Sequence, residues 1–131
     1  MPFREMSQRL GLTEATIRSR LRRLEAAKVM RVVARIDLKA SGFPFTALVG
    51  LKIRGRSVDA VAQDLKKIPE IISILVVIGR ADLEIQVTAR SMEMLNELLN
   101  VRVAAIKGVV GLDTALAMDI VKYVQPWGSF E

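Results

Sequence analysis

Closely spaced arginine side chains are the first feature of this sequence that could do chemistry. Arg18, Arg22 and Arg23 lie within six residues of one another, in a stretch where apolar residues follow the spacing of a helix. Guanidinium groups bind phosphate oxygens and guanine edges, so duplex DNA is a polyanion that such a cluster fits. A solvated basic face on an ordinary helix is the simpler alternative for any pair of arginines.

The distribution of charge along the chain favours the DNA interpretation. Residues 1–40 hold ten Lys and Arg against four Asp and Glu, whereas residues 41–131 hold ten of each. The whole formal charge of +6 therefore belongs to the first third of the chain. A basic module next to a neutral one predicts a polyanion partner for the first and a different task for the second.

Catalytic chemistry has little support in the remaining residue types. The chain has no His and no Cys, which excludes His-based nucleophile and base pairs, thiolate metal sites and disulfides. The carboxylates of Asp82, Glu84 and Asp113 lack the pattern of a partner base or a metal site. An enzyme is the weakest alternative, and we predict no enzyme activity, no cofactor and no metal.

Length and composition indicate a folded protein of one or two small units. The 131 residues are 51% apolar, which is ample for a hydrophobic core. No apolar run is long enough to span a bilayer, and charged residues occupy the N-terminus where a signal peptide would be apolar. We therefore expect a cytoplasmic protein without a membrane partner.

Two helices separated by a tight turn are predicted to position the arginines. The first covers residues 4–10 and ends at Gly11, and the second covers residues 14–27 with Thr13 as its N-cap. The apolar stripe of the second helix contains Ile17, Leu21 and Leu24. This arrangement is typical of a helix-turn-helix.

The side of the second helix opposite its apolar stripe, together with the helix start, is the candidate DNA-binding face. Small side chains there permit close approach to the floor of a groove, and the arginines can contact phosphates or bases. The predicted DNA-binding residues are Thr13, Ala15, Thr16, Arg18, Ser19, Arg22 and Arg23.

A short strand or wing is expected after the helices, at residues 29–38, because this segment is rich in β-branched residues. The loop Ser41-Gly42-Phe43-Pro44 then marks a domain boundary. We therefore predict a helix-turn-helix domain with its wing at residues 1–40 and a second domain at residues 41–131.

The second domain is predicted to be ferredoxin-like, with the order βαββαβ. Both of its helices would cover one face of a four-stranded antiparallel sheet, which makes the whole chain an α+β protein. The expected strands are 45–53, 71–79, 83–89 and 109–123, and the expected helices are 57–68 and 91–101.

One face of this sheet would be left without helices. The strand at 71–78 is apolar at nearly every position, and the last strand is expected to carry Leu112, Leu116, Met118 and Ile120 on a single side. An apolar face without a partner in so short a chain predicts burial against a second subunit.

Two segments of the sequence resemble a known family. Residues 11–30 (GLTEATIRSRLRRLEAAKVM) are similar to the turn, recognition helix and wing entry of Lrp/AsnC regulators. Residues 76–87 (VVIGRADLEIQV) resemble the segment around the Gly-x-x-Asp motif in the C-terminal domain of that family. The similarity runs over about residues 4–123, and the two motifs at this separation are specific together.

The resemblance implies a homodimer built through the C-terminal domains, often assembled further into octamers, which binds an amino acid or related metabolite as its effector. The Gly-x-x-Asp turn and a polar residue of the last strand would contribute to the effector pocket. The corresponding residues are Gly79, Arg80, Ala81, Asp82 and Thr114. An ordinary turn between strands is the alternative for Gly79 and Asp82, because these residue types dominate such turns.

Two features depart from the family pattern. Ala81 occupies a position where relatives commonly carry an aromatic residue, which implies a wider pocket or another ligand. The first helix of the family's DNA-binding domain has no counterpart, so Met6, Leu10, Ile17 and Leu21 are expected to lack an apolar partner. A late start codon, a truncation and a loss of DNA binding each fit this difference, and we favour truncation.

The predicted function is a sequence-specific DNA-binding transcription regulator that responds to an amino acid or related metabolite. Paired basic helices of an oligomer would contact double-stranded DNA about one helical turn apart. The alternative is a stand-alone metabolite-binding and oligomerisation module that does not bind DNA.

Overall fold

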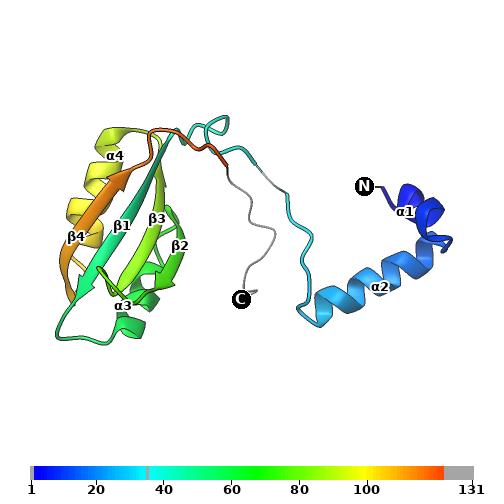
Figure 1. Cartoon of the computed structure of the whole chain (residues 1–131), viewed down its shortest axis with the longest axis horizontal. Helices are drawn as coiled ribbons and strands as arrows, with labels where there is room; N and C mark the ends of the chain where they lie inside the picture. The colour runs from blue at the N-terminus through cyan, green and yellow to red at the C-terminus, as the bar shows by residue number, and fades with distance from the viewer. Residues whose placement is uncertain (1, 35, 123–131) are drawn as a thin grey trace. The chain divides into compact units, whose positions relative to one another are not determined.

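A computed structural model of the chain describes residues 2–34 and 36–122 (Figure 1). The described residues form two compact units, one up to residue 34 and one from residue 36 onward. We call them the helical unit and the sheet unit. No helix in the described ranges is long and apolar enough to cross a membrane.

The helical unit contains α1 (Phe3–Leu10) and α2 (Glu14–Ala26). Gly11 ends α1 in the left-handed region at φ 64°, which glycine adopts without the strain of a Cβ, and its N–H donates to the carbonyl of Ser7. Thr13 caps α2, as predicted, because its hydroxyl accepts a hydrogen bond from the N–H of Thr16. Both helices therefore match the sequence prediction within one residue at each end.

Only one side chain of residues 2–34 is buried, that of Ile17 on α2. Met6 and Leu21 are half-buried, whereas Leu10 remains 64% exposed. The expected lack of an apolar partner therefore holds for Leu10, whereas the side chain of Ile17 is buried despite that expectation.

The strand or wing predicted after α2 does not form in the described residues. Residues 30–34 and 36–37 have no regular structure, and Val32, Val33 and Ile36 are about 70% exposed. Their β-branched side chains favour an extended backbone, but a strand also needs a partner for its hydrogen bonds, and none pairs with them in the described ranges. A turn follows, in which the Asp37 carboxylate accepts the N–H of Ala40 at 2.8 Å.

The sheet unit is a four-stranded antiparallel sheet with the order β2-β3-β1-β4. Its strands are β1 (Phe45–Ile53), β2 (Ile71–Val76), β3 (Leu83–Ala89) and β4 (Val109–Leu116). Its helices are α3 (Val58–Leu65), α4 (Met92–Glu97) and the π-helix η1 (Leu98–Val103), which continues α4. The element order confirms the predicted α+β arrangement of the second domain, with β1 and β3 at the predicted bounds.

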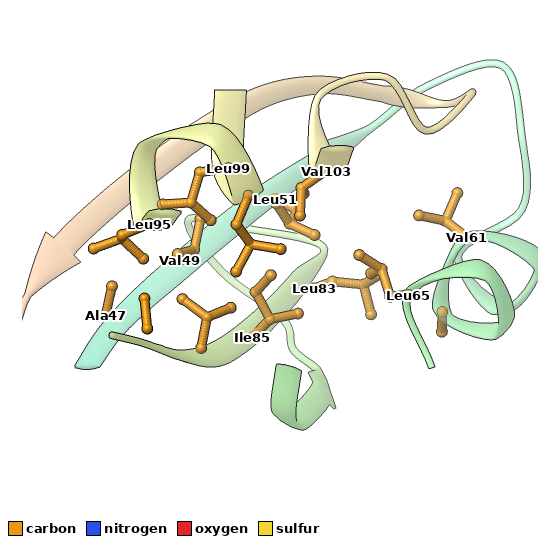
Figure 2. Packing of buried hydrophobic residues seen from close by; sticks show 14 residues of the cluster. Ala47, Val49, Leu51, Val61, Leu65, Leu83, Ile85, Leu95, Leu99 and Val103 are labelled. Carbon is orange, nitrogen blue, oxygen red and sulfur yellow. The ribbon is translucent and has the colours of Figure 1, made fainter. Parts of the chain in front are cut away.

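Fourteen apolar residues form one core between the helices and one face of the sheet (Figure 2). The two central strands contribute alternate residues, such as Val49 and Leu51 on β1 and Ile85 on β3, because side chains alternate between the two faces of a strand. Leu65 from α3 and Leu95 from α4 lie at opposite ends of this cluster in Figure 2 and belong to the same core. Ser57 and Ser91 cap these helices, as predicted.

The last strand is shorter than predicted. β4 ends at Leu116, so Met118 and Ile120 lie beyond the strand, and residue 123 lies outside the described residues. Leu112 pairs with Leu51 and Leu116 with Ala47, both core residues, which places the two leucines on the helix-covered side.

The helix-free face is less apolar than predicted. It carries polar and small side chains in the register of the strands: Lys52, Glu84, Gln86, Thr88, Gly111 and Asp113. Its exposed apolar residues include Leu48 on β1, Leu75 on the edge strand β2 and Ala115 on β4. The apolar sequence of β2 instead leaves Val76 and Ile78 exposed along the edge of the sheet and in the turn after it.

Candidate DNA-binding surface and effector site

The outer face of α2 brings most of the predicted DNA-binding residues together. Ala15, Arg18, Ser19 and Arg22 line one hollow in the surface of the helical unit. All four are exposed, whereas Ile17, on another side of the same helix, is buried. Small side chains alternate with guanidinium groups along this hollow. A ligand here could therefore approach the helix backbone closely and also form ionic contacts with the arginines.

Arg18 has an additional intramolecular partner. Its guanidinium lies over the ring of Phe3, 5.1 Å from the ring centroid. The contact is a cation–π interaction, which fixes the direction of the side chain while its charge stays exposed. Sequence reasoning missed Phe3, because the spacing of residues along α2 contains no information on which α1 residue faces it.

The other predicted contact residues surround the hollow without lining it. Thr13 and Thr16 lie at the start of α2 and hydrogen-bond to each other through their hydroxyls, 2.8 Å apart. Arg23 is exposed on the last part of the helix. The positive end of the helix dipole at the start of α2 also favours a phosphate there.

The predicted effector residues 79–82 form the turn between β2 and β3. Gly79 has φ 143°, a conformation that side chains rarely allow, and the turn is closed by a hydrogen bond from Val77 N–H to Asp82 C=O at 3.2 Å. The backbone of Asp82 also donates to Leu51 C=O at 2.9 Å. The turn is therefore tied to the end of β1.

The side chains of this turn point in different directions. Asp82 is half-buried, and its carboxylate accepts the N–H of Ile53 at 2.8 Å. Arg80 is exposed, and its guanidinium lies 3.9 Å from the carboxylates of both Glu84 and Asp113. Arg80 is thus the member of the turn whose charged end is accessible to a ligand.

Ala81 is buried against β1. A Cβ added to Gly50 would lie 3.2 Å from the Cβ of Ala81, so these two small residues fit each other on the helix-free side of the sheet. The sequence motif indicated Ala81 but not Gly50, whose role depends on strand register. A large side chain at either position would displace its neighbour.

Thr114 does not join the other predicted effector residues. It pairs with Val49, which faces the helices, whereas its neighbour Asp113 pairs with Gly50 on the opposite face. The structure therefore brings Asp113 toward Arg80 and leaves Thr114 on the other side of β4. The residue types alone could not show which of Asp113 and Thr114 lies on the side of Arg80, because a register shift of one residue moves every side chain of a strand to the other face.

Two ion-pair clusters lie elsewhere on the sheet unit. Arg102 binds Glu70 through two hydrogen bonds of 2.7 and 3.2 Å, which lowers the pKa of Glu70 below its ordinary value. Lys67 and Arg56 each contact Asp64 and lower the pKa of its carboxyl group. Among the described residues, no group of three Asp and Glu side chains could hold a metal ion.

Comparison with known proteins identifies the sheet unit. The family model described as the Lrp/AsnC ligand binding domain matches residues 46–127. The HTH-type transcriptional regulator FL11 of Pyrococcus horikoshii is 32% identical over 118 residues, covering 89% of this chain and 78% of that protein. The FL11 regulator of Pyrococcus furiosus is 31% identical over 123 residues, covering 93% and 81%. These relatives are transcription regulators, in agreement with the prediction that the chain is no enzyme.

Solved structures agree with this assignment. A feast or famine regulatory protein from Mycobacterium tuberculosis, complexed with L-methionine, has 25% identity and a TM-score of 0.83, covering 98% of this chain and 86% of that chain. A leucine response regulatory protein from the same organism has 26% identity and a TM-score of 0.78, covering 93% and 84%. AsnC of E. coli, at 16% identity and a TM-score of 0.84, shares the fold over 94% of this chain and 84% of its own.

Proposed function

We propose that this chain, which belongs to the Lrp/AsnC family of transcription regulators, binds specific DNA sequences and responds to an amino acid or related metabolite. In this proposal α1, the turn at Gly11 and α2 act as the helix-turn-helix, within a DNA-binding domain of residues 1–40. Residues 41–131 form the effector-binding and oligomerisation domain.

The hollow on α2 is the observation that supports DNA binding. Ala15 and Ser19 allow the helix to approach the floor of the major groove, and Arg18 and Arg22 at its rim reach phosphates or guanine edges. Thr13, Thr16 and Arg23 extend the contact along the helix. The charge of +6 in residues 1–40 strengthens binding to any duplex.

The effector would bind next to the turn at residues 79–82. Arg80 offers a guanidinium to the carboxylate of an amino acid, a pairing that forms two parallel hydrogen bonds. Glu84 and Asp113, each 3.9 Å from the Arg80 guanidinium, would accept hydrogen bonds from its ammonium group. Because Thr114 lies on the other face of β4, its contribution would require a second subunit.

The chain is proposed to act as a homodimer or a higher oligomer such as an octamer. Regulators of this kind contact two DNA half-sites, which requires two copies of α2. An effector at an interface between subunits can change affinity for DNA only if it binds one arrangement of the subunits more tightly.

Fluorescence anisotropy with a labelled duplex from the region upstream of the gene tests DNA binding. We expect binding that weakens steeply with salt, and Arg22→Ala should reduce the slope of log K against log salt by about 1. Lys107→Ala removes the same charge from an exposed position of the sheet unit and serves as the matched control. Absence of binding at low salt, or equal loss in both variants, would contradict the proposal.

A stand-alone effector-binding module is the second candidate. The sheet unit has a core of its own, whereas the helical unit buries only Ile17 among its described residues. This candidate predicts an oligomer that binds an amino acid and shows no DNA binding in the same anisotropy experiment.

A further inference from the structure

Where the pairing between β1 and β3 ends, one backbone N–H group of β1 has no hydrogen-bond acceptor on β3. β3 begins at Leu83, whose partner is Leu51, so the N–H of Ile53 lies two residues beyond the last pair. On the other side of β1, the pairing with β4 shifts register between Lys52 and Ile53. A backbone N–H at such a place needs an acceptor that the strands do not provide.

Asp82 provides this acceptor from the effector turn. Its carboxylate Oδ2 accepts the Ile53 N–H at 2.8 Å, across 29 residues of sequence. Its own N–H donates to Leu51 C=O, and its C=O accepts the N–H of Val77. One residue thus connects β1, the end of β2 and the start of β3.

We infer that Asp82 is a positioning residue for the effector site, and not a residue that binds the effector by its charge. The inference rests on the proposed effector site at residues 79–82. The Asp82 side chain holds the turn against β1, and this fixes Ala81 next to Gly50. Arg80 is thereby held near Glu84 and Asp113 with its guanidinium accessible.

The conservative variant Asp82→Asn separates the two roles. Its side-chain carbonyl has the shape of the carboxylate and can accept the Ile53 N–H, but it carries no negative charge. A positioning role needs only the acceptor, so Asp82→Asn should behave like the unmodified protein and Asp82→Ala should not. A direct ionic contact with an ammonium group would make both variants fail equally.

Hydrogen exchange of the Ile53 amide, measured by NMR without any ligand, tests the positioning role first. We expect Asp82→Ala to accelerate exchange at Ile53 by about tenfold or more, and Asp82→Asn to stay within about threefold of the unmodified protein. The Thr46 amide, at the other end of β1, is the internal control. Its exchange rate should be the same in the unmodified protein and both variants. Equal protection of Ile53 in all three proteins would overturn the inference.

Calorimetric titration with each of the twenty proteinogenic L-amino acids supplies the functional readout. For an amino acid that binds the unmodified protein, Asp82→Asn should keep the affinity within about threefold and Asp82→Ala should lower it about tenfold or more. Loss of binding in Asp82→Asn with Ile53 still protected would overturn the inference. If Asp82→Ala does not fold, the affinity and the Ile53 exchange of Asp82→Asn, compared with those of the unmodified protein, still decide whether the charge of Asp82 binds the effector.

The two experiments separate this inference from the proposed function. If no amino acid binds the unmodified protein, the proposed effector class is wrong, whereas the exchange of Ile53 still measures whether Asp82 holds the turn. If an amino acid binds and the exchange of Ile53 does not depend on residue 82, the effector site stands and the positioning role falls.

Discussion

The helical unit and the sheet unit differ in what determines their structure. Among the described residues, the helical unit buries one side chain, Ile17, while the sheet unit buries fourteen apolar residues in one core. Burial of apolar surface is the main favourable term in folding, so the sheet unit has most of the stability. The helical unit is instead distinguished by its exposed arginines. In this chain the residues that determine the fold and those proposed to contact DNA therefore lie in different units.

The most sensitive test of this difference replaces one buried isoleucine in each unit. Ile85→Ala removes a fully buried side chain from β3 and should lower the free energy of unfolding of the sheet unit by about 2–5 kcal/mol. Ile17→Ala should leave that free energy unchanged and remove hydrogen-exchange protection from α1 and α2 alone. Urea unfolding with exchange measured by mass spectrometry checks both. A loss of sheet stability in Ile17→Ala would show that the units are energetically coupled.

A glycine with positive φ in each unit gives a smaller contrast. Gly108→Ala combines an unfavourable φ of 103° with a Cβ placed 2.9 Å from the Cβ of Arg56, so we expect a cost of about 2 kcal/mol. Gly11→Ala places alanine in the left-handed helical region at φ 64°, and nothing lies within 4 Å of the new Cβ, so its cost should be about 1 kcal/mol. Equal effects would mean that crowding around Gly108 is relieved by movement of Arg56. Thermal unfolding of the two variants is the measurement.

Removing one ion pair in each unit should have the smallest effect. Glu70→Gln breaks the bidentate contact with Arg102, and Glu5→Gln breaks the exposed pair with Arg9. We expect losses below about 1 kcal/mol for the first and below about 0.5 kcal/mol for the second, because water screens both pairs.

The loss in Glu70→Gln should depend on pH. Arg102 lowers the pKa of Glu70 in the folded protein, so the stabilisation is complete above the ordinary value of 4.5 and disappears as the pH falls through the lowered pKa. Urea unfolding of Glu70→Gln and the unmodified protein at pH 7 and at successively lower pH should therefore converge. A difference that stays constant down to acid pH would contradict an ionic origin.

Local sequence patterns predicted the elements whose residues are determined by burial. The alternation in FTALVGLKI and LEIQVTA placed β1 and β3 correctly, because each has one face in the core. Helical spacing and end signals, such as Gly11 and the N-cap residues, placed α1, α2 and the serine caps of α3 and α4. The prediction of a strand failed for the described residues among 29–38, where composition favours a strand but pairing depends on segments elsewhere in the chain.

The candidate sites divide in a similar way. Helical periodicity placed Ala15, Ser19 and Arg22 on one face of α2, and in the structure these three residues and Arg18 line one hollow. The side chains around Arg80 were harder, because the proximity of Asp113 depends on the register of β4 against β1 and on the irregularity at Lys52 and Ile53. Tertiary pairing of this kind leaves no periodic trace in the sequence.

The π-helix η1 bears on natural variation in the length of this segment. Its hydrogen bond from Ala104 N–H to Leu99 C=O spans five residues, one more than an α-helical turn. Loss of one residue between Leu99 and Ala104 would convert the turn into a regular α-helix without lengthening the element. We expect homologues to differ by single-residue deletions at this place while Leu98 and Val103 keep apolar counterparts, and their sequences would align with a gap inside a helix.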